Sequence, residues 1–471
     1  MEDRERQVSG ESAQPSPRDS AAGEPAARAP FEPWRASPEG VEIRPSGPVR
    51  GSVRPPGSKS ITNRALVCAA LARGRSILTG ALDSEDTRVM FEALGQLGIA
   101  LALDPADRVI TVTGCAGKLP ATRADVFVDN SGTTARFLAA VLTLGQGIYR
   151  LDGAPRMRER PIQDLVDALR ALGADVASDQ DTGCPPLLVR AAGLAGGVAT
   201  VRGEISSQFL SGLLLSAPYA AQPIELVVEG ELVSKPYVSM TLEVMRDFGV
   251  EVVAEGFTRF HVPNDRPYQG REFAIEPDAS AASYFLAAAA ITGGEVRVEG
   301  LSRASLQGDV AFVDLLEQMG CEVRHEADAI TVRGPELTGR KLRGIDCDMN
   351  AISDTVQTLA AVALFADGPT TVTGVPHIRH KETDRLAALA TELRKFGAEV
   401  EERPDGLRIT PPASPAELHG AAIDTYRDHR MAMSLALVGL RVPGVTIRDP
   451  GCVAKTYPEF FDDLLDLVAG S

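Results

Sequence analysis

Small apolar residues recur along the chain in a pattern that predicts one structural unit repeated six times. An Ala- and Leu-rich stretch with helical periodicity is followed by a Gly break and a short run with strand character that ends in a turn. The turns fall at Gly80, Gly153, Gly230, Gly300, Gly374 and Asp449, so consecutive turns lie 70–77 residues apart.

A second pattern lies between these turns and predicts an amphipathic helix, a glycine stop and another strand. The glycines that end these helices are Gly98, Gly173, Gly249, Gly320 and Gly397, with spacings of 71–77 residues. Glycine directly after the last turn is the expected C-terminal cap of a helix. A sixth such helix lies in residues 457–470, and the strand that should follow it is predicted to come from "VEIRPS" at residues 41–46.

The two interleaved patterns predict an α/β protein built from six related units, and their regular spacing argues against a chance similarity. A single core rarely grows beyond about 250–300 residues, so two lobes of three units each are expected. A cleft between two such lobes is the expected ligand site.

Composition narrows the class of protein. The 471 residues carry a formal charge of −16, which argues against nonspecific binding to nucleic acid. The six cysteines form no Cys-x-x-Cys pair, and no apolar run is long enough to span a membrane. Residues 1–40 are rich in Pro, Ala, Ser, Glu and Arg without apolar periodicity, so they are predicted to be a disordered tail. The chain is expected to be cytoplasmic, because this segment has neither the apolar core of a signal peptide nor the acid-poor composition of a transit peptide.

Cationic side chains gather in loops at the starts of predicted helices, although the helix dipole disfavours cations there. Such repetition suggests that a bound anion offsets the cost, and the free backbone N–H groups of a helix start can hold phosphate or carboxylate. These segments contain Lys59, Ser60 and Arg64; Asn130 to Thr133; Arg160; Ser206, Ser207 and Gln208; Ser234 and Tyr237; Asp354; Lys381, Glu382 and Arg385; Arg430; and Lys455.

Each segment also has a plainer interpretation. Ser60, Asp354 or Asp428 could act only as helix caps, and "KETDR" could be a solvated first turn. The loop at Lys59 lacks the Gly-x-x-x-x-Gly-Lys spacing of an ATP-binding loop, and the lysine in "HIRHKE" would repel a metal ion. No metal site is predicted.

Eight motifs together resemble the 3-phosphoshikimate 1-carboxyvinyltransferase (EPSP synthase) family of enolpyruvyl transferases. In chain order they are "PGSKSITNRAL", "DNSGTTARF", "RMRERPI", "SSQFLSGLLL", "DASAASYFLAAAAI", "KETDRL", "DHRMAMSLAL" and "AKTYPEF". The resemblance covers residues 41–465. It implies an inverse α/β barrel of two lobes, each with three βαβαββ repeats, with residues 58–276 in the first lobe and residues 41–57 and 277–468 in the second.

The resemblance also implies the reaction. The enolpyruvyl group of phosphoenolpyruvate passes to the 5-hydroxyl of shikimate-3-phosphate through a tetrahedral intermediate, and phosphate is released. This is a step of the shikimate pathway to chorismate and the aromatic amino acids. No metal or organic cofactor is implied, and the enzyme is expected to be a monomer that binds neither nucleic acid nor membrane.

Site residues are carried over from the family motifs. For shikimate-3-phosphate the resemblance implies Lys59, Ser60, Arg64, Ser206, Ser207, Gln208, Ser234, Asp354 and Lys381, with Tyr237 nearby. For phosphoenolpyruvate it implies Lys59, Gly132, Arg160, Gln208, Arg385, Arg430 and Lys455. The resemblance makes Asp354 the base and Glu382 the acid, assisted by Lys59. An acid needs a raised pKa, whereas nearby lysines would lower the pKa of Glu382.

Three features leave alternatives open. His377 stands where many members of the family have Asn, and Phe137 stands where some have Pro. The sister enzymes transfer enolpyruvate to UDP-N-acetylglucosamine and use a catalytic cysteine, for which Cys115 is the candidate. A noncatalytic scaffold would not require Asp354, Glu382 and the cations to occur together. The "KETDR" and "GSKSITNRAL" segments favour shikimate-3-phosphate as the acceptor.

Overall fold

The computed structural model describes residues 34–37 and 40–470 of the chain. The strands of this part form six four-stranded sheets, and every sheet repeats one arrangement. An edge strand runs parallel to a central strand, which pairs on its other side with an antiparallel hairpin. None of the helices in these ranges is long and apolar enough to cross a membrane.

Three sheets take their strands from residues 75–274. They are β15–β4–β6–β5 (Glu272–Ala274, Arg75–Thr79, Val109–Thr113, Ala100–Asp104), β7–β8–β10–β9 (Arg123–Phe127, Gln146–Asp152, Leu187–Ala192, Asp175–Ser178) and β11–β12–β14–β13 (Gly197–Arg202, Ile224–Glu229, Arg259–Val262, Val253–Glu255).

The other three sheets combine both ends of the chain with its second half. They are β3–β16–β18–β17 (Arg50–Val53, Glu295–Glu299, Ala329–Arg333, Glu322–His325), β19–β20–β22–β21 (Asp346–Asp348, Thr370–Thr373, Gly406–Thr410, Glu399–Arg403) and β23–β24–β2–β1 (Ala422–Ile423, Val445–Ile447, Gly40–Ile43, Trp34–Ser37).

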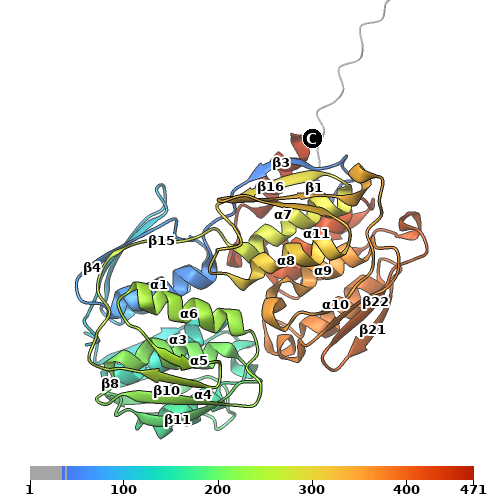
Figure 1. Cartoon of the computed structure of the whole chain (residues 1–471). Coiled ribbons are helices and arrows are strands. Elements are labelled where there is room, and N and C mark those ends of the chain that lie inside the picture. The colour runs from blue at the N-terminus through green and yellow to red at the C-terminus, as the bar shows by residue number, and fades with distance from the viewer. Residues whose placement is uncertain (1–33, 38–39, 471) are drawn as a thin grey trace, which may run out of the picture. The chain divides into compact units, whose positions relative to one another are not determined.

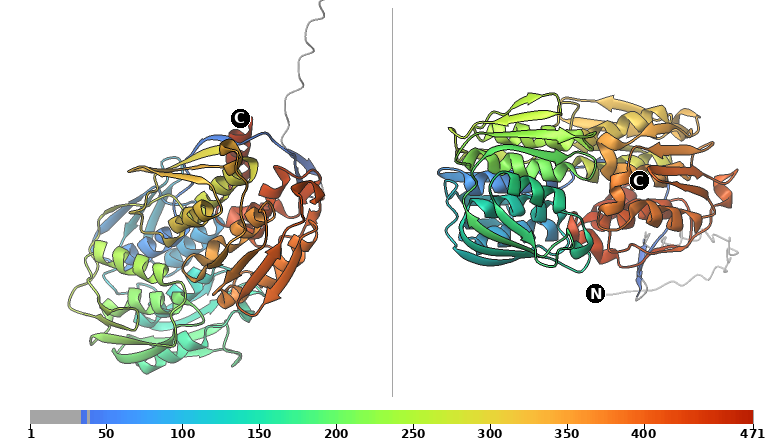
Figure 2. Two further views of the ribbon diagram at one scale, coloured as in Figure 1. Left: turned by 45° about the vertical axis from the view of Figure 1, so that its right-hand side comes forward. Right: turned by 90° about the horizontal axis from the view of Figure 1, so that it is seen from below.

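The N-terminal strands complete the last sheet. Strand β2 pairs antiparallel with β24, with Val41 opposite Ile447, and β1 then pairs with β2. Figure 2 shows these blue strands next to the red C-terminal part of the chain. The prediction that "VEIRPS" supplies a strand to the last unit is therefore confirmed.

Strand β1 also corrects the predicted tail. The segment 1–40 was expected to be disordered, but Trp34–Ser37 forms a strand whose backbone groups pair with those of β2. The remainder of the predicted tail, apart from Gly40, lies outside the described residues.

Six helices rich in Ala and Leu are buried almost all round their circumference. A helix without a polar face cannot lie on a protein surface, so these helices form the inside of each lobe and the sheets lie outside them. Figure 1 shows α3 and α5 near α1, and α7, α9 and α11 together in the other lobe. The buried helices are α1 (Lys59–Leu71), α3 (Gly132–Val141), α5 (Ser207–Ser216), α7 (Ala279–Thr292), α9 (Val356–Ala363) and α11 (His429–Gly439).

The remaining α-helices are the amphipathic ones of the second sequence pattern: α2 (Glu85–Gln96), α4 (Gln163–Ala171), α6 (Lys235–Asp247), α8 (Phe312–Gln318), α10 (Arg385–Arg394) and α12 (Phe460–Ala469). The five glycines predicted to stop such helices all have φ between 85° and 108°, the left-handed region that favours glycine. This prediction is confirmed.

Short 3-10 helices connect several of these elements. They are η1 (Leu142–Leu144), η2 (Met157–Glu159), η3 (Ala217–Tyr219), η4 (Gly308–Ala311), η5 (Pro335–Thr338), η6 (Asn350–Thr355), η7 (Pro376–His380), η8 (Pro415–Glu417) and η9 (Pro450–Lys455).

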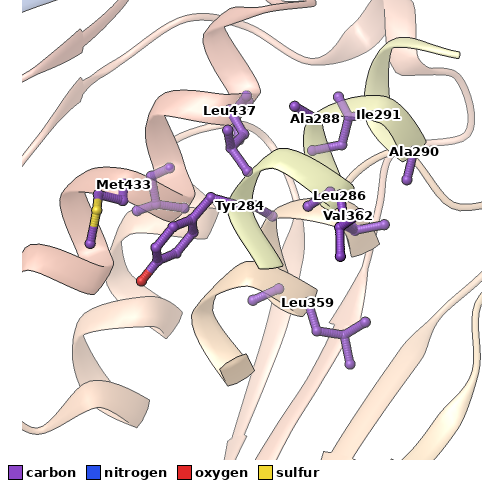
Figure 3. Packing of buried hydrophobic residues seen from close by; sticks show 14 of the residues in the cluster. Tyr284, Leu286, Ala288, Ala290, Ile291, Leu359, Val362, Met433 and Leu437 are labelled. Atoms are coloured by element: carbon purple, nitrogen blue, oxygen red, sulfur yellow. The ribbon is translucent and has the colours of Figure 1, made fainter. Parts of the chain in front are cut away.

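Two separate hydrophobic clusters fill the two lobes. One runs from Ile61 to Ile275, and the other joins Ile43, Val49 and Val53 to the segment from Ala279 to Val468. Figure 3 shows Ile291, Val362 and Leu437, from α7, α9 and α11, in the second cluster. The predicted boundaries of the lobes, residues 58–276 and residues 41–57 with 277–468, stay a prediction.

We expect Leu437→Ala to destabilise the protein by about 2–5 kcal/mol, because removal of a fully buried leucine side chain would leave a cavity among three packed helices. The matched control is Leu337→Ala, since Leu337 is 42% exposed and should change stability by less than about 0.5 kcal/mol. Urea unfolding of both variants measures the difference. Equal unfolding midpoints would contradict this description of the core.

Candidate active site

One cavity gathers most of the residues that the sequence singled out. Thirteen of the fifteen predicted site residues line it, together with Thr133 and Tyr237. The thirteen are Lys59, Ser60, Arg64, Gly132, Arg160, Ser207, Gln208, Ser234, Asp354, Lys381, Glu382, Arg385 and Arg430. Ser206 and Lys455 line two adjoining cavities instead, which share Gln208 and Glu382 with this one.

Helix starts converge on the cavity. Lys59, Gly132 and Ser207 are the first residues of α1, α3 and α5, while α10 and α11 contribute Arg385 and Arg430 from their first turns. The N-terminal ends of several helices therefore add partial positive charge to that of the side chains.

Serine side chains cap three of these helices, and Ser131 caps α3 by accepting a hydrogen bond from the Thr134 N–H. Ser58 is the N-cap of α1 and accepts a hydrogen bond from the Ile61 N–H, so the suggestion that Ser60 is the cap is wrong. Ser60 is one residue inside the helix and lines the cavity. Ser206 caps α5 by accepting from the Gln208 N–H at 3.2 Å, which explains why it lies at the edge of the site.

Arg160 packs closely against Gly132, and a side chain at position 132 would displace its guanidinium. A Cβ atom on Gly132 would lie 2.3 Å from the Nη2 atom of Arg160. The Arg160 guanidinium donates to the carbonyl oxygen of Asn130 at 3.0 Å and to its side-chain oxygen at 3.2 Å. The loop from Asn130 to Gly132 and Arg160 thus form one closely packed unit.

The buried arginines of the first lobe make no ion pair among the described residues. Arg64 donates to Thr241 Oγ1 at 2.8 Å and to the carbonyl oxygens of Ser60 and Tyr237, and Arg160 is held by Asn130. Burial lowers the pKa of Arg64 to about 10 and also lowers the pKa of Arg160. Positive charge buried without a carboxylate is costly, so this side of the cavity favours an anionic ligand.

Phe137 has a clear place in this arrangement. The centre of its ring lies 5.2 Å from the Arg64 Cζ atom, which gives a cation–π contact beneath the guanidinium. Phe137 itself is fully buried.

The cations of the second lobe are paired with carboxylates. Asp354 accepts from Arg430 at 2.8 Å and from Arg385 at 3.2 Å, and Lys381 Nζ lies 3.7 Å away. Burial opposes ionisation of Asp354, but these cations prevail and hold its pKa well below the usual value.

Glu382 is held by a similar set of charges. Its carboxylate lies 2.9 Å from Arg385 and 3.9 Å from Lys455, and Asp428 binds the same Arg385 at 2.8 Å. Burial alone would raise the pKa of Glu382, yet Arg385, Lys455 and Arg160 together keep it well below the ordinary value. The balance that the sequence left open therefore favours the ionised carboxylate.

Asp86, which the sequence did not single out, contacts two of the predicted site residues. Lys59 Nζ lies 3.8 Å from Asp86, and Lys455 Nζ lies 3.5 Å from its other oxygen, so one buried carboxylate joins lysines from both lobes. The local sequence around Asp86 shows only the capping box of Ser84 and Thr87, which gave no sign of this contact.

Ser234 joins the two lobes in a strained backbone conformation. Its φ of 54° is unusual for a residue other than glycine, and its N–H donates to Asn350 Oδ1 at 3.0 Å. Its hydroxyl lies 3.3 Å from Ser353 Oγ and 3.3 Å from His377 Nε2. His377 therefore supports Ser234 from an adjoining cavity, and burial lowers its pKa to about 3, which keeps the ring neutral.

Cys115 does not line the cavity, and burial raises the pKa of its thiol. It follows strand β6 in the first lobe, where its N–H donates to the Ala70 carbonyl. Nothing in its position supports a nucleophilic role. Within residues 34–37 and 40–470, no group of three or more His, Cys, Asp or Glu residues is placed to hold a metal ion.

Comparisons with known proteins agree on one family. The family model described as EPSP synthase (3-phosphoshikimate 1-carboxyvinyltransferase) matches residues 43–464. The 3-phosphoshikimate 1-carboxyvinyltransferase of Nostoc punctiforme is 52% identical over 415 residues, covering 88% of this chain and 95% of the relative. That of Trichormus variabilis is 49% identical over 421 residues, covering 89% and 97%. The solved EPSP synthase of Acinetobacter baumannii superposes with a TM-score of 0.75 at 26% identity, covering 90% of this chain and 97% of that one.

We expect Arg385→Met to destabilise the protein by about 3–5 kcal/mol, because Glu382 and Asp428 would be left as buried carboxylates without their shared cation. Arg303→Met is the matched control, since its ion pair with Asp314 is exposed and should contribute less than about 1 kcal/mol. Urea unfolding at neutral pH compares the two. A loss no larger than that of the control would show that Arg385 does not hold the carboxylates together.

Proposed function

The chain belongs to the EPSP synthase family. We propose that the cavity between its lobes is the active site and that different residues of its lining bind each substrate and transfer protons. The enzyme transfers the enolpyruvyl group of phosphoenolpyruvate to the 5-hydroxyl of shikimate-3-phosphate, releasing phosphate and forming 5-enolpyruvylshikimate-3-phosphate. The observation that carries the assignment of the site is the set of buried arginines in the first lobe that lack a carboxylate partner.

Shikimate-3-phosphate is proposed to lie against the first lobe. Its phosphate and carboxylate would meet Arg64, Lys381 and the hydroxyl groups of Ser60, Ser206, Ser207 and Ser234, with Gln208 and Lys59 beside them. Arginine and serine donors at helix starts suit both anions. Gln208 already faces the cavity, where its amide donates to Thr133 at 3.3 Å.

Phosphoenolpyruvate is proposed to bind between Arg160 and the second-lobe cations. Arg385 and Arg430 can each form a two-pronged contact with a carboxylate or phosphate, and Lys59 and Lys455 supply point charges. Gly132 leaves the space that Arg160 needs to reach the same anion.

Asp354 is proposed to be the base and Glu382 the acid. The low pKa of each carboxylate reflects the surrounding cations. Two substrates that each carry a phosphate and a carboxylate would bind those cations and reduce their influence, which raises the pKa of Glu382 towards the value an acid needs. Substrate binding would thus prepare the acid.

The bond changes balance with these two groups. The 5-oxygen bonds to C2 of phosphoenolpyruvate while its proton passes to Asp354, and Glu382 gives a proton to the methylene carbon C3. In the second step, Glu382 takes a proton back from C3, the double bond re-forms and the C2–O bond to phosphate breaks. In the net reaction the hydroxyl proton ends on the released phosphate.

We propose that the enzyme works in the cytoplasm as a monomer and without a cofactor. The proposed reaction supports the last point, since each step uses only acid–base groups and cations supplied by the chain.

The first test is the choice of acceptor. The purified protein with phosphoenolpyruvate should release phosphate when shikimate-3-phosphate is added and release none with UDP-N-acetylglucosamine. Release only with the sugar nucleotide would move the protein to the sister activity, and no release with either acceptor would overturn the proposed function.

We expect Asp354→Asn and Glu382→Gln each to lower kcat by about 100-fold or more, the usual contribution of a general acid or base. Because both substitutions keep the shape of the side chain, the affinity for shikimate-3-phosphate, measured by calorimetry, should change little. Glu322→Gln is the control, because the Glu322 carboxylate is exposed and its ion-pair partner is Arg333. Wild-type turnover in either active-site variant would remove that residue from the mechanism.

A further inference from the structure

A second buried aspartate lies near the proposed base Asp354 and has no role in the reaction proposed above. Asp309, in η4 of the second lobe, is only 4% exposed. Its carboxylate lies 3.0 Å from the Tyr237 hydroxyl, and the same hydroxyl lies 3.3 Å from the carboxylate of Asp354. One phenol therefore stands between two buried carboxylates.

Tyr237 reaches this position from the other lobe. It belongs to α6, whereas Asp309 and Asp354 belong to η4 and η6. Its ring lines the cavity, so the phenol oxygen connects the wall of the active site with a carboxylate behind it. A phenol has one proton and can donate to only one of its two neighbours at a time.

We propose that Asp309 receives, through Tyr237, the proton that Asp354 takes from the acceptor hydroxyl, an inference that rests on the proposed role of Asp354 as the base. Protonated Asp354 gives its proton to the Tyr237 oxygen while Tyr237 gives its own to Asp309. Asp354 is thereby returned to its ionised form, and the only net change is one proton gained by Asp309. After the reaction the transfers reverse, and Asp354 releases the proton to solvent, from which the free phosphate is protonated.

The charges around the two carboxylates favour this direction. Arg430, Lys381 and Arg385 stabilise the ionised form of Asp354. Asp309 makes no ion pair in the part of the chain that the structure describes, and its Oδ1 atom is buried there without a hydrogen-bond partner. Burial and the negative charge of Asp354 raise the pKa of Asp309 to about 6, against the weaker opposing effects of Ser280, Arg430 and Tyr237. A proton is therefore held more readily on Asp309 than on Asp354.

The relay also explains how the base can be effective with so many cations beside it. Those cations make Asp354 a weak proton acceptor, and a proton left on it would be returned to the ether oxygen. Passing the proton to Asp309 removes it from the reacting atoms and keeps Asp354 as the anionic partner of Arg430.

The decisive variant is Asp309→Asn, which keeps the shape of the side chain but cannot accept the proton. We expect its single-turnover rate to fall by about 100-fold at neutral pH, with the KM of both substrates changed less than about twofold. In the wild type, the rate should decline as pH falls through about 6, because Asp309 must be ionised to accept a proton. This decline should be absent from the profile of the variant. Asp314→Asn, the same substitution at a 39% exposed position five residues away, should leave the rate and the profile unchanged.

A second variant decides the matter even if Asp309→Asn does not fold. Ser280 donates a hydrogen bond to the Asp309 carboxylate, which favours its ionised form. Ser280→Ala removes this donor, so the decline in rate should move to higher pH. An unchanged profile in Ser280→Ala, or a wild-type rate and profile in Asp309→Asn, would overturn the relay.

A double variant separates the relay from simple packing. In a Tyr237→Phe background the chain of transfers is already broken, so adding Asp309→Asn should slow the reaction no further. Multiplying losses would overturn the relay in favour of independent structural roles. Failure of the proposed function is distinguishable, because it appears as inactivity of the wild type with shikimate-3-phosphate or as full activity of Asp354→Asn.

Discussion

The burial of positive charge at one cavity is the constraint on which this structure depends. A guanidinium taken out of water without a carboxylate is destabilising unless its donors are satisfied and an anion compensates its charge. Arg64 meets the first condition with a threonine hydroxyl, two carbonyl groups and the face of Phe137. The second condition calls for a ligand with more than one anionic group. The six repeats bring cationic helix starts to one place. Each lobe packs three apolar helices side by side, and several of those helices begin at the cavity.

The two lobes contribute opposite kinds of surface to the same reaction. Among the described residues, the hydrogen bonds of Arg64 and Arg160 in the first lobe go to neutral groups. The arginines of the second lobe are instead paired with Asp354, Glu382 and Asp428. An anionic substrate must therefore compete with the enzyme's own carboxylates for the second set. This competition couples binding to acid–base chemistry, because a carboxylate that shares its cation with a substrate regains affinity for a proton. In the proposed mechanism, substrate binding itself would therefore convert Glu382 from carboxylate to acid.

Most of the fold could be predicted from the sequence because the residues that end its helices are required by local backbone conformation. The stop glycines recur at fixed intervals since each must adopt a positive φ that other residues avoid, and this requirement is visible without any tertiary contact. The charged residues at helix starts could also be predicted, because their position relative to each helix can be read from the local sequence. Asp86 and Asp309 were not predicted, because each lies in an ordinary local setting, a capping box and a short 3-10 turn, and is given its role by residues more than 25 positions away. Strand β1 was missed because it lies within residues 1–40, a segment whose overall composition is typical of disorder.

Tyr237 shows what the two-lobe design adds beyond a binding site. Its hydroxyl meets Asp309 and Asp354 only because α6 of one lobe lies against η4 and η6 of the other, just as Ser234 at the start of α6 meets Asn350 and His377. The groups of the proposed relay are thus brought together by the contact between the two lobes. Exclusion of water strengthens the electrostatic interactions inside and prevents leakage of the proton. A separation of the lobes would remove the phenol from both carboxylates at once, so the proposed relay requires the lobes to be in contact.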